Sequence, residues 1–351
     1  MSTSDVTRRA GDHKGEGRKR EGRKGEQPMV PPAAFTSYYG TPVLNPPVWE
    51  ARDIAGYFFL GGLAGGASLL AAGADLTGQP ALGRVAKAGA FAGGLLSFGL
   101  LVDDLGRPAR FLNMLRVFKP TSPMSVGSWV LAGYVPACGV AALCAMTGRL
   151  PRAGAIATTG AAVLAPVVAS YTAALISDTA VPAWHDGYPE MPFVFTGSGA
   201  MAAGGLALLA APPSESAPAR NLAILGTAME LAAFTRMERR IGMTAEPYTT
   251  GRGGRYLRAA KILALAGAAG AAASGLLPGR ALPGREGSGR RVVAALSGAA
   301  LVAASAATRW GIFHAGLESA RDPKYTVVPQ RQRRAAQAAD GVPPATRIPP
   351  A

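Results

Sequence analysis

Residues 53–74 read DIAGYFFLGGLAGGASLLAAGA, and Asp53 is the only charged residue in this stretch. A helix of about 20 mostly apolar residues is long enough to cross the ~30 Å hydrocarbon layer of a bilayer. Seven further segments of this kind follow, at 85–103, 125–147, 154–177, 191–211, 221–241, 257–277 and 292–314. They are rich in Ala, Gly and Leu and do not alternate apolar with polar residues, which excludes membrane-spanning strands. The sequence therefore predicts an all-α integral membrane protein with eight transmembrane helices.

A short internal similarity indicates how these helices are grouped. Residues 63–70 read LAGGASLL, and residues 202–209 read AAGGLALL. Small residues such as these glycines let helix backbones approach one another closely in lipid. Because the two stretches lie in the first and fifth predicted helices, we expect two four-helix bundles.

The composition fits a membrane protein and excludes several other classes. Of the 351 residues, 49% are apolar and only 16% are charged, against about 25% charged in soluble domains. The net charge of +15 comes from tails and loops, where basic residues set membrane topology, so nucleic-acid binding is not expected. Cys138 and Cys144 are too few for an iron–sulfur cluster, which needs about four thiolates. With only three histidines, we expect no haem, cluster or other metal site in this chain, and no catalytic residue.

The polar and apolar stretches divide the chain into three parts. Residues 1–48 form a basic, Pro-rich N-terminal tail that we expect to be disordered, residues 49–316 form the membrane domain, and residues 317–351 form a polar, partly disordered C-terminal tail. Eight spans place both tails on one side, which carries most of the Lys and Arg residues. The positive-inside rule therefore predicts a multi-pass protein of the cell inner or plasma membrane with both termini in the cytoplasm.

Most polar side chains near the helix ends gather on the rim that holds the termini. Ionisable groups in such places are costly, so they are candidates for function. The candidate binding residues are Asp53, Tyr57, Asp104, Tyr171 and His185. Simpler alternatives exist: Asp53 could pair with Arg52, and Asp104 could cap a helix. Tyr171 could be an ordinary interfacial aromatic residue, and His185 a solvated loop residue.

Glu230 is different, because it lies near the middle of the sixth predicted helix. An unpaired carboxylate is expensive at that depth. Arg236 lies one and a half turns further along and is poorly placed to pair with it. Glu230 is therefore a candidate for a proton path, and the alternative is a protonated, hydrogen-bonded packing residue.

Residues 103–129 read DDLGRPARFLNMLRVFKPTSPMSVGSW, which is too polar to cross the membrane and too apolar for a free loop. Basic residues such as Arg107 and Arg110 alternate with apolar residues such as Phe111 and Leu112. This pattern predicts a short amphipathic helix in the membrane interface, between the second and third transmembrane helices. It would serve as an anchor or as a ledge on which a partner subunit docks.

The same stretch also carries a family resemblance. Its segments at 104–116 and 120–129 resemble the NrfD/PsrC-type membrane subunits, known as the polysulfide reductase NrfD family. Further matching stretches are YFFLGGLAGG at 57–66, YTAALI at 171–176 with PAW at 182–184, and RDPKYTVVPQR at 321–331. The resemblance covers about residues 38–330.

The resemblance implies a membrane anchor subunit of a molybdoenzyme-like redox complex. Such subunits exchange electrons between the quinone or menaquinone pool and an iron–sulfur, ferredoxin-like partner, which connects to a molybdopterin-type catalytic subunit. The family's quinone head group sits among the ends of the first, second and fourth helices. By position, Tyr171 matches the family's quinone-facing tyrosine and Asp104 the start of the loop motif. Where the family often has a histidine and an asparagine on the first helix, this chain has Glu50, Asp53 and Tyr57.

Two functions thus remain open at the level of sequence. The first is a quinone-reactive subunit of an oxidoreductase, in which Tyr and carboxylate groups bind the quinone and exchange its protons. The second is a structural or proton-conducting membrane anchor without quinone chemistry of its own. The substrate of the catalytic partner and the direction of electron flow are not encoded in this chain.

Overall fold

The computed structural model describes residues 43–107, 109–276 and 288–339, which form helices joined by short turns and contain no strand. This confirms the expected all-helical fold for the described part of the chain. Most of the predicted N-terminal tail, and the end of the predicted C-terminal tail, lie outside the described residues.

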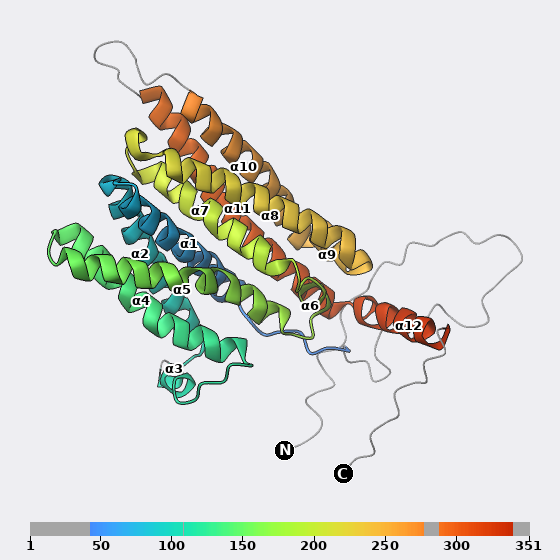
Figure 1. Ribbon diagram of the computed structural model, residues 1–351. Helices are drawn as coiled ribbons and strands as arrows, with labels where there is room; N and C mark the ends of the chain where they lie inside the picture. The colour runs from blue at the N-terminus through green and yellow to red at the C-terminus, as the bar shows by residue number, and fades with distance from the viewer. Residues whose placement is uncertain (1–42, 108, 277–287, 340–351) are drawn as a thin grey trace, which may run out of the picture.

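Long helices coincide with each of the expected apolar segments (Figure 1). They are α1 (Ala51–Leu76), α2 (Pro80–Asp104), α4 (Pro123–Thr147), α5 (Pro151–Ser177), α7 (Met191–Ala210), α8 (Ala217–Ile241), α10 (Gly251–Leu276) and α11 (Ser288–Arg321). Among the described residues, seven of these helices are long and apolar enough to cross a membrane, and α8 is the one outside that group. The chain is thus a multi-pass membrane protein, and the crossing by α8 stays a prediction.

The shorter helices lie between the long ones or after them. They are α3 (Ala109–Met114), α6 (Pro182–Asp186), α9 (Glu246–Thr249), α12 (Lys324–Ala339) and the 3-10 turns η2 (Pro213–Glu215) and η3 (Gly242–Ala245). The expected interfacial helix corresponds to α3, in which Phe111 is buried against Phe98 with ring centroids 4.7 Å apart. Leu112 is 66% exposed, so Phe111 alone anchors this helix by burial.

Part of the predicted C-terminal tail is helical. Helix α11 continues past residue 316, the predicted end of the membrane domain, and α12 follows after a short break. Lys324 holds the start of α12 through an ion pair with Glu246 of α9 at 3.0 Å, and Tyr325 is buried beside it.

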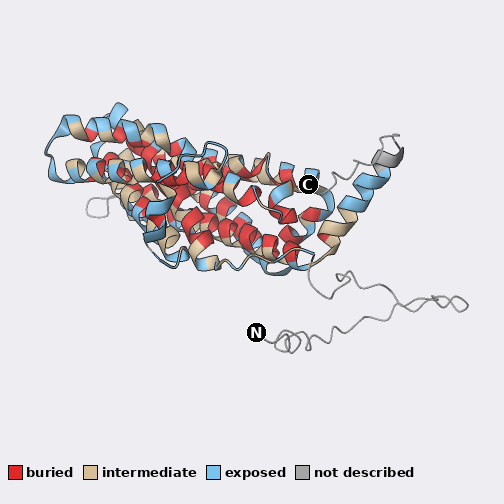
Figure 2. Ribbon diagram, turned by 90° about the horizontal axis from the view of Figure 1, so that it is seen from below, coloured by how far each residue is buried: buried red, intermediate tan, exposed pale blue. Residues whose placement is uncertain are grey.

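The long helices pack in an order that follows the chain. Helices α1, α2, α4 and α5 contact one another in a ring, and so do α7, α8, α10 and α11. The two groups meet where α1 packs on α7, with further contacts from α5 to α7 and from α1 to α11. Figure 2 shows the buried residues along the middle of this assembly and the exposed residues on its outer faces.

Glycines make the central contact possible. A side chain on Gly66 of α1 would meet the backbone oxygen of Gly199 on α7 at 2.7 Å. On Gly199, a Cβ would in turn meet the backbone of Gly62. Such close backbone approach is what small residues allow in a membrane, where dispersion contacts drive helix association.

Candidate functional site

Two of the predicted site residues, Tyr57 of α1 and Tyr171 of α5, contact each other. Their ring centroids lie 6.3 Å apart in an edge-on arrangement, and both side chains are buried. The Tyr171 ring lies so close to Gly127 of α4 that any side chain at position 127 would collide with it. The tyrosine pair therefore sits where α1, α4 and α5 converge.

The hydroxyl group of Tyr171 is buried and has no hydrogen-bond partner among the described residues. Thr172 and Ser177, on the same end of α5, also carry buried hydroxyl oxygens without a partner. An unpaired buried polar group costs about 1–3 kcal/mol, and native proteins contain few of them. The Tyr171 hydroxyl is thus a buried donor that no described group uses.

Carboxylates surround the rim next to this pair. The side chain of Asp53 is 13% exposed and lies 4.0 Å from the guanidinium of Arg52, which is itself 80% exposed and so a weak partner. Asp104, at the end of α2, is close enough to Asp53, Asp103 and Glu50 for their negative charges to repel its own. The structure thus brings Asp53 and Asp104 into one acidic group at the ends of α1 and α2.

His185 lies on α6, next to the end of α5. It is exposed on α6, and its Nδ1 atom lies 3.1 Å from the backbone oxygen of Ser177 at the end of α5. Its neighbour Trp184 is fully buried, stacks on Trp49 at 5.9 Å and donates a hydrogen bond to the Ile312 backbone at 2.8 Å. Trp184 therefore anchors α6 and His185 is exposed beside it, so the binding role of His185 stays a prediction.

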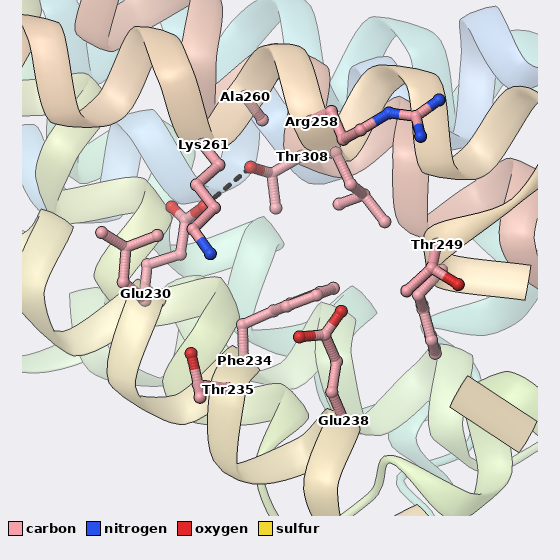
Figure 3. Close-up of a pocket in the computed structure, with 12 residues that line it drawn as sticks. Glu230, Phe234, Thr235, Glu238, Thr249, Arg258, Ala260, Lys261 and Thr308 are labelled. Carbon is pink, nitrogen blue, oxygen red and sulfur yellow. Dashed lines mark hydrogen bonds between the residues drawn. The ribbon is translucent and has the colours of Figure 1, made fainter. Parts of the chain in front are cut away.

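A second group of polar residues lies around Glu230 in the other half of the molecule. The Thr308 hydroxyl of α11 donates a hydrogen bond of 2.7 Å to Glu230 Oε1, whereas the buried Oε2 has no partner in the part of the chain that the structure describes. Glu230 lines a cavity of about 340 Å³ between α8 and α10, together with Glu238 and Lys261 (Figure 3). The charge of Lys261 attracts Glu238. A buried carboxylate thus lines a cavity that also contains charged side chains.

Sequence reasoning missed one residue of this group, Arg309 of α11. Its side chain is only 1% exposed, its guanidinium lies 3.7 Å from the centre of the Phe195 ring, and Nη2 donates a 2.7 Å hydrogen bond to the Phe195 backbone oxygen. Its remaining nitrogens, Nε and Nη1, have no partner, and its charge attracts Glu230. The available signal was a lone arginine within the apolar segment 292–314.

Arg236 is not the partner of Glu230. It lies 3.5 Å from Glu190, which also receives hydrogen bonds of 2.9 and 2.7 Å from Arg240. These arginines hold the pKa of Glu190 below its usual value. The ion pairs of Glu190 with Arg236 and Arg240 therefore connect the turn before α7 to the end of α8.

The described residues contain no group of three or more His, Cys, Asp and Glu side chains that could hold a metal ion.

The family model for polysulphide reductase NrfD matches residues 42–235. The chain belongs to the NrfD family. No curated protein shows significant similarity to it. The NrfD match runs from the approach to α1 into α8, so it contains the tyrosine pair, the acidic group and Glu230, whereas α10 and α11 lie beyond it. Members of this family are membrane subunits of redox complexes, and this chain is one of them.

Proposed function

We propose that this chain is the membrane anchor subunit of a multi-subunit oxidoreductase and exchanges electrons between the quinone or menaquinone pool and an iron–sulfur partner subunit. The observation that carries the proposal is the buried, unpartnered hydroxyl of Tyr171 beside Tyr57, at the acidic rim of an NrfD-family subunit. All eight long helices, α8 included, span the membrane in two four-helix bundles, with both termini in the cytoplasm.

The quinone supplies the two-electron chemistry, and the chain supplies the binding groups and the protons. Tyr171 donates its hydroxyl hydrogen to a carbonyl oxygen of the head group, which satisfies the buried group. Tyr57 packs against Tyr171 and fixes its ring. Asp53 and Asp104 are the groups at the rim that exchange protons between the quinol and water.

The partner subunits dock on the same rim. An iron–sulfur, ferredoxin-like subunit receives or delivers the electrons and connects to a molybdopterin-type catalytic subunit. Helices α3, α6 and α12 all belong to this end of the molecule (Figure 1). They offer exposed side chains such as Leu112, Tyr188 just after α6, and the arginines of α12.

The first test is Tyr171→Phe, measured in the intact complex. We expect quinol-linked turnover to fall about tenfold or more, because one hydrogen bond to the head group is lost. Turnover with an artificial dye that reacts directly with the partner should stay unchanged. Tyr134→Phe is the matched control, since Tyr134 is also buried but pairs with Ser68 at 2.7 Å away from the site. Unchanged quinol-linked turnover in Tyr171→Phe would remove this residue from the site.

The cavity beside Glu230 favours a second function, the movement of protons through the membrane. Glu230 has one oxygen bound to Thr308 and one oxygen free, so it can accept a proton without breaking its hydrogen bond. Glu238 and Lys261 extend the polar lining of the cavity beside it. In this reading the chain conducts protons, whether or not it also binds quinone.

Glu230→Gln tests this second function. The amide keeps an acceptor for Thr308 but cannot carry a proton, so proton uptake by vesicles containing the complex should fall while quinone reduction continues. Glu215→Gln is the control, because Glu215 also accepts one hydrogen bond, from the Leu82 amide at 2.8 Å, outside the cavity. Proton uptake that is equal in both variants and the wild type would rule out a role for Glu230.

A further inference from the structure

A pocket of about 620 Å³ lies between the start of α10 and the end of α11, and it shares Arg258 with the cavity beside Glu230. Arginines dominate its lining. The charged and titratable residues around it are Arg252, Arg255, Arg258, Arg321, His314 and Glu318. Four guanidinium groups thus face a single carboxylate.

That carboxylate is already engaged with the backbone. Glu318 Oε1 accepts a 2.8 Å hydrogen bond from the backbone N–H of Arg252, in the first turn of α10. Glu318 also packs against Gly251, whose φ of +58° and lack of a side chain leave room for it. Glu318 therefore satisfies the start of the helix, where backbone N–H groups lack intrahelical partners.

The arginine side chains themselves remain without counter-charges. None of the four takes part in an ion pair with another described residue. Arg252, Arg255, Arg258 and Arg321 are all exposed. The pocket therefore has an excess of positive charge and free planar donors, which suit the oxygens of a phosphate group.

The outer face of α10 indicates where that phosphate comes from. Arg255 and Arg258 lie on the same face as Ile262 and Leu265, because these positions are three or four residues apart. Ile262 is 68% exposed and Leu265 is 51% exposed. A basic pocket at the rim thus continues into a bare apolar surface that points towards the interior of the membrane.

We infer that this pocket binds the phosphate group of an anionic phospholipid, whose acyl chains lie along Ile262 and Leu265. Basic pockets between helices at the cytoplasmic side of a membrane attract such head groups. Free phosphate would use the arginines but not the apolar surface, and an acidic partner protein would not need that surface either. A phospholipid accounts for both parts of the site, because its phosphate group pairs with the arginines and its acyl chains cover the exposed apolar residues.

The test uses the purified full chain in detergent, titrated with dioleoyl phosphatidylglycerol, with dioleoyl phosphatidylcholine and with inorganic phosphate. The site variant is Arg255→Gln/Arg258→Gln. The control is Arg149→Gln/Arg152→Gln, which removes two exposed arginines with the same spacing at the opposite rim. Retained lipid is counted by native mass spectrometry, and affinity is read from the lipid-dependent rise in melting temperature.

We expect the wild type and the control to bind phosphatidylglycerol in preference to phosphatidylcholine. Binding of phosphatidylglycerol should weaken roughly 30-fold in the site variant, since each basic residue near an anionic lipid contributes about fivefold. Equal weakening in the control would overturn the inference, because it would reflect net charge alone. Inorganic phosphate that binds as tightly as the lipid would mark a site for a soluble anion. Unchanged phosphatidylglycerol binding in the site variant would also overturn the inference.

Discussion

Two glutamates of this chain are both buried, yet their surroundings give them different chemistry. Glu190 lies at the rim and receives several guanidinium hydrogen bonds from Arg240, which keep it ionised. Glu230 lies inside a helix and receives one hydroxyl hydrogen bond, with Arg309 as an attracting charge. A fully paired carboxylate fixes structure, whereas a carboxylate with a free oxygen can take up a proton. Glu190 is thus a structural group and Glu230 the candidate proton carrier.

The ion pair between Glu190 and Arg240 makes the free energy of unfolding depend on pH. Because Arg240 holds the pKa of Glu190 below its usual value of 4.5, the pair contributes fully above that value and loses its contribution as the pH falls through the lowered pKa. Glu190→Gln should reduce the free energy of unfolding by about 1 kcal/mol at neutral pH, a modest value because Arg240 is 39% exposed and its charge is screened.

Thermal unfolding in detergent, measured from neutral pH into the acid range, checks this prediction. The melting temperatures of Glu190→Gln and the wild type should converge as the pH falls below 4.5 and through the lowered pKa of Glu190. Glu50→Gln serves as the control, since Glu50 is exposed at the same rim and forms no ion pair with another described residue. A difference between Glu190→Gln and the wild type that stays constant over the whole range would contradict the assigned role.

At the scale of elements, the sequence predicted the helices well where length and composition decide them. Each long helix overlaps an expected segment, because a bilayer requires about 20 apolar residues. The sequence did not predict α12, because its polar residues and internal proline, Pro329, are typical of a tail. Contacts of Lys324 and Tyr325 stabilise the start of this helix in the structure. It did predict a short amphipathic helix where α3 lies, but not that Phe111 alone would be buried in it.

Helix contacts depend on glycines that the sequence showed but could not place. Gly66→Ala should destabilise the fold by about 1–3 kcal/mol, because its Cβ would meet the Gly199 backbone at 2.7 Å and Ala203 at 2.8 Å. Gly73→Ala, in the same helix α1, should be neutral or stabilising, since no atom lies within 4 Å of the added carbon. Melting temperatures of the two variants in detergent provide the comparison. Equal effects at both positions would show that α1 and α7 do not pack as described.

At the scale of the whole molecule, the helices run up and down so that the rim near the termini collects residues far apart in the sequence. Topology alone predicted that Asp53, Asp104 and Tyr171 would share this rim. It did not predict that Tyr171 lies on Gly127, or that Arg309 lies beside Phe195. Those contacts depend on the rotation of each helix about its axis, which a chain of Ala, Gly and Leu specifies weakly.

The orientation of α8 decides the topology of the entire protein. The charged residues of α8 gather at its two ends and are therefore at the rims, apart from Glu230, which Thr308 contacts inside the fold, and we expect α8 to cross the membrane. Ser214, between α7 and α8, and Thr250, between α8 and α10, are both exposed and should lie on opposite sides.

Cysteine labelling tests this arrangement. In a Cys138→Ser/Cys144→Ser background, an impermeant maleimide should label Ser214→Cys in intact cells and Thr250→Cys only in inverted vesicles. The positive-inside rule fixes this direction, because the rim with Thr250 carries Arg252, Arg255 and Arg258. Labelling of both positions from one side would show that α8 does not cross, and the two termini would then lie on opposite sides of the membrane. Opposite labelling with the sides exchanged would keep all eight spans but move the tyrosine pair, and any partner docked beside it, to the outer face.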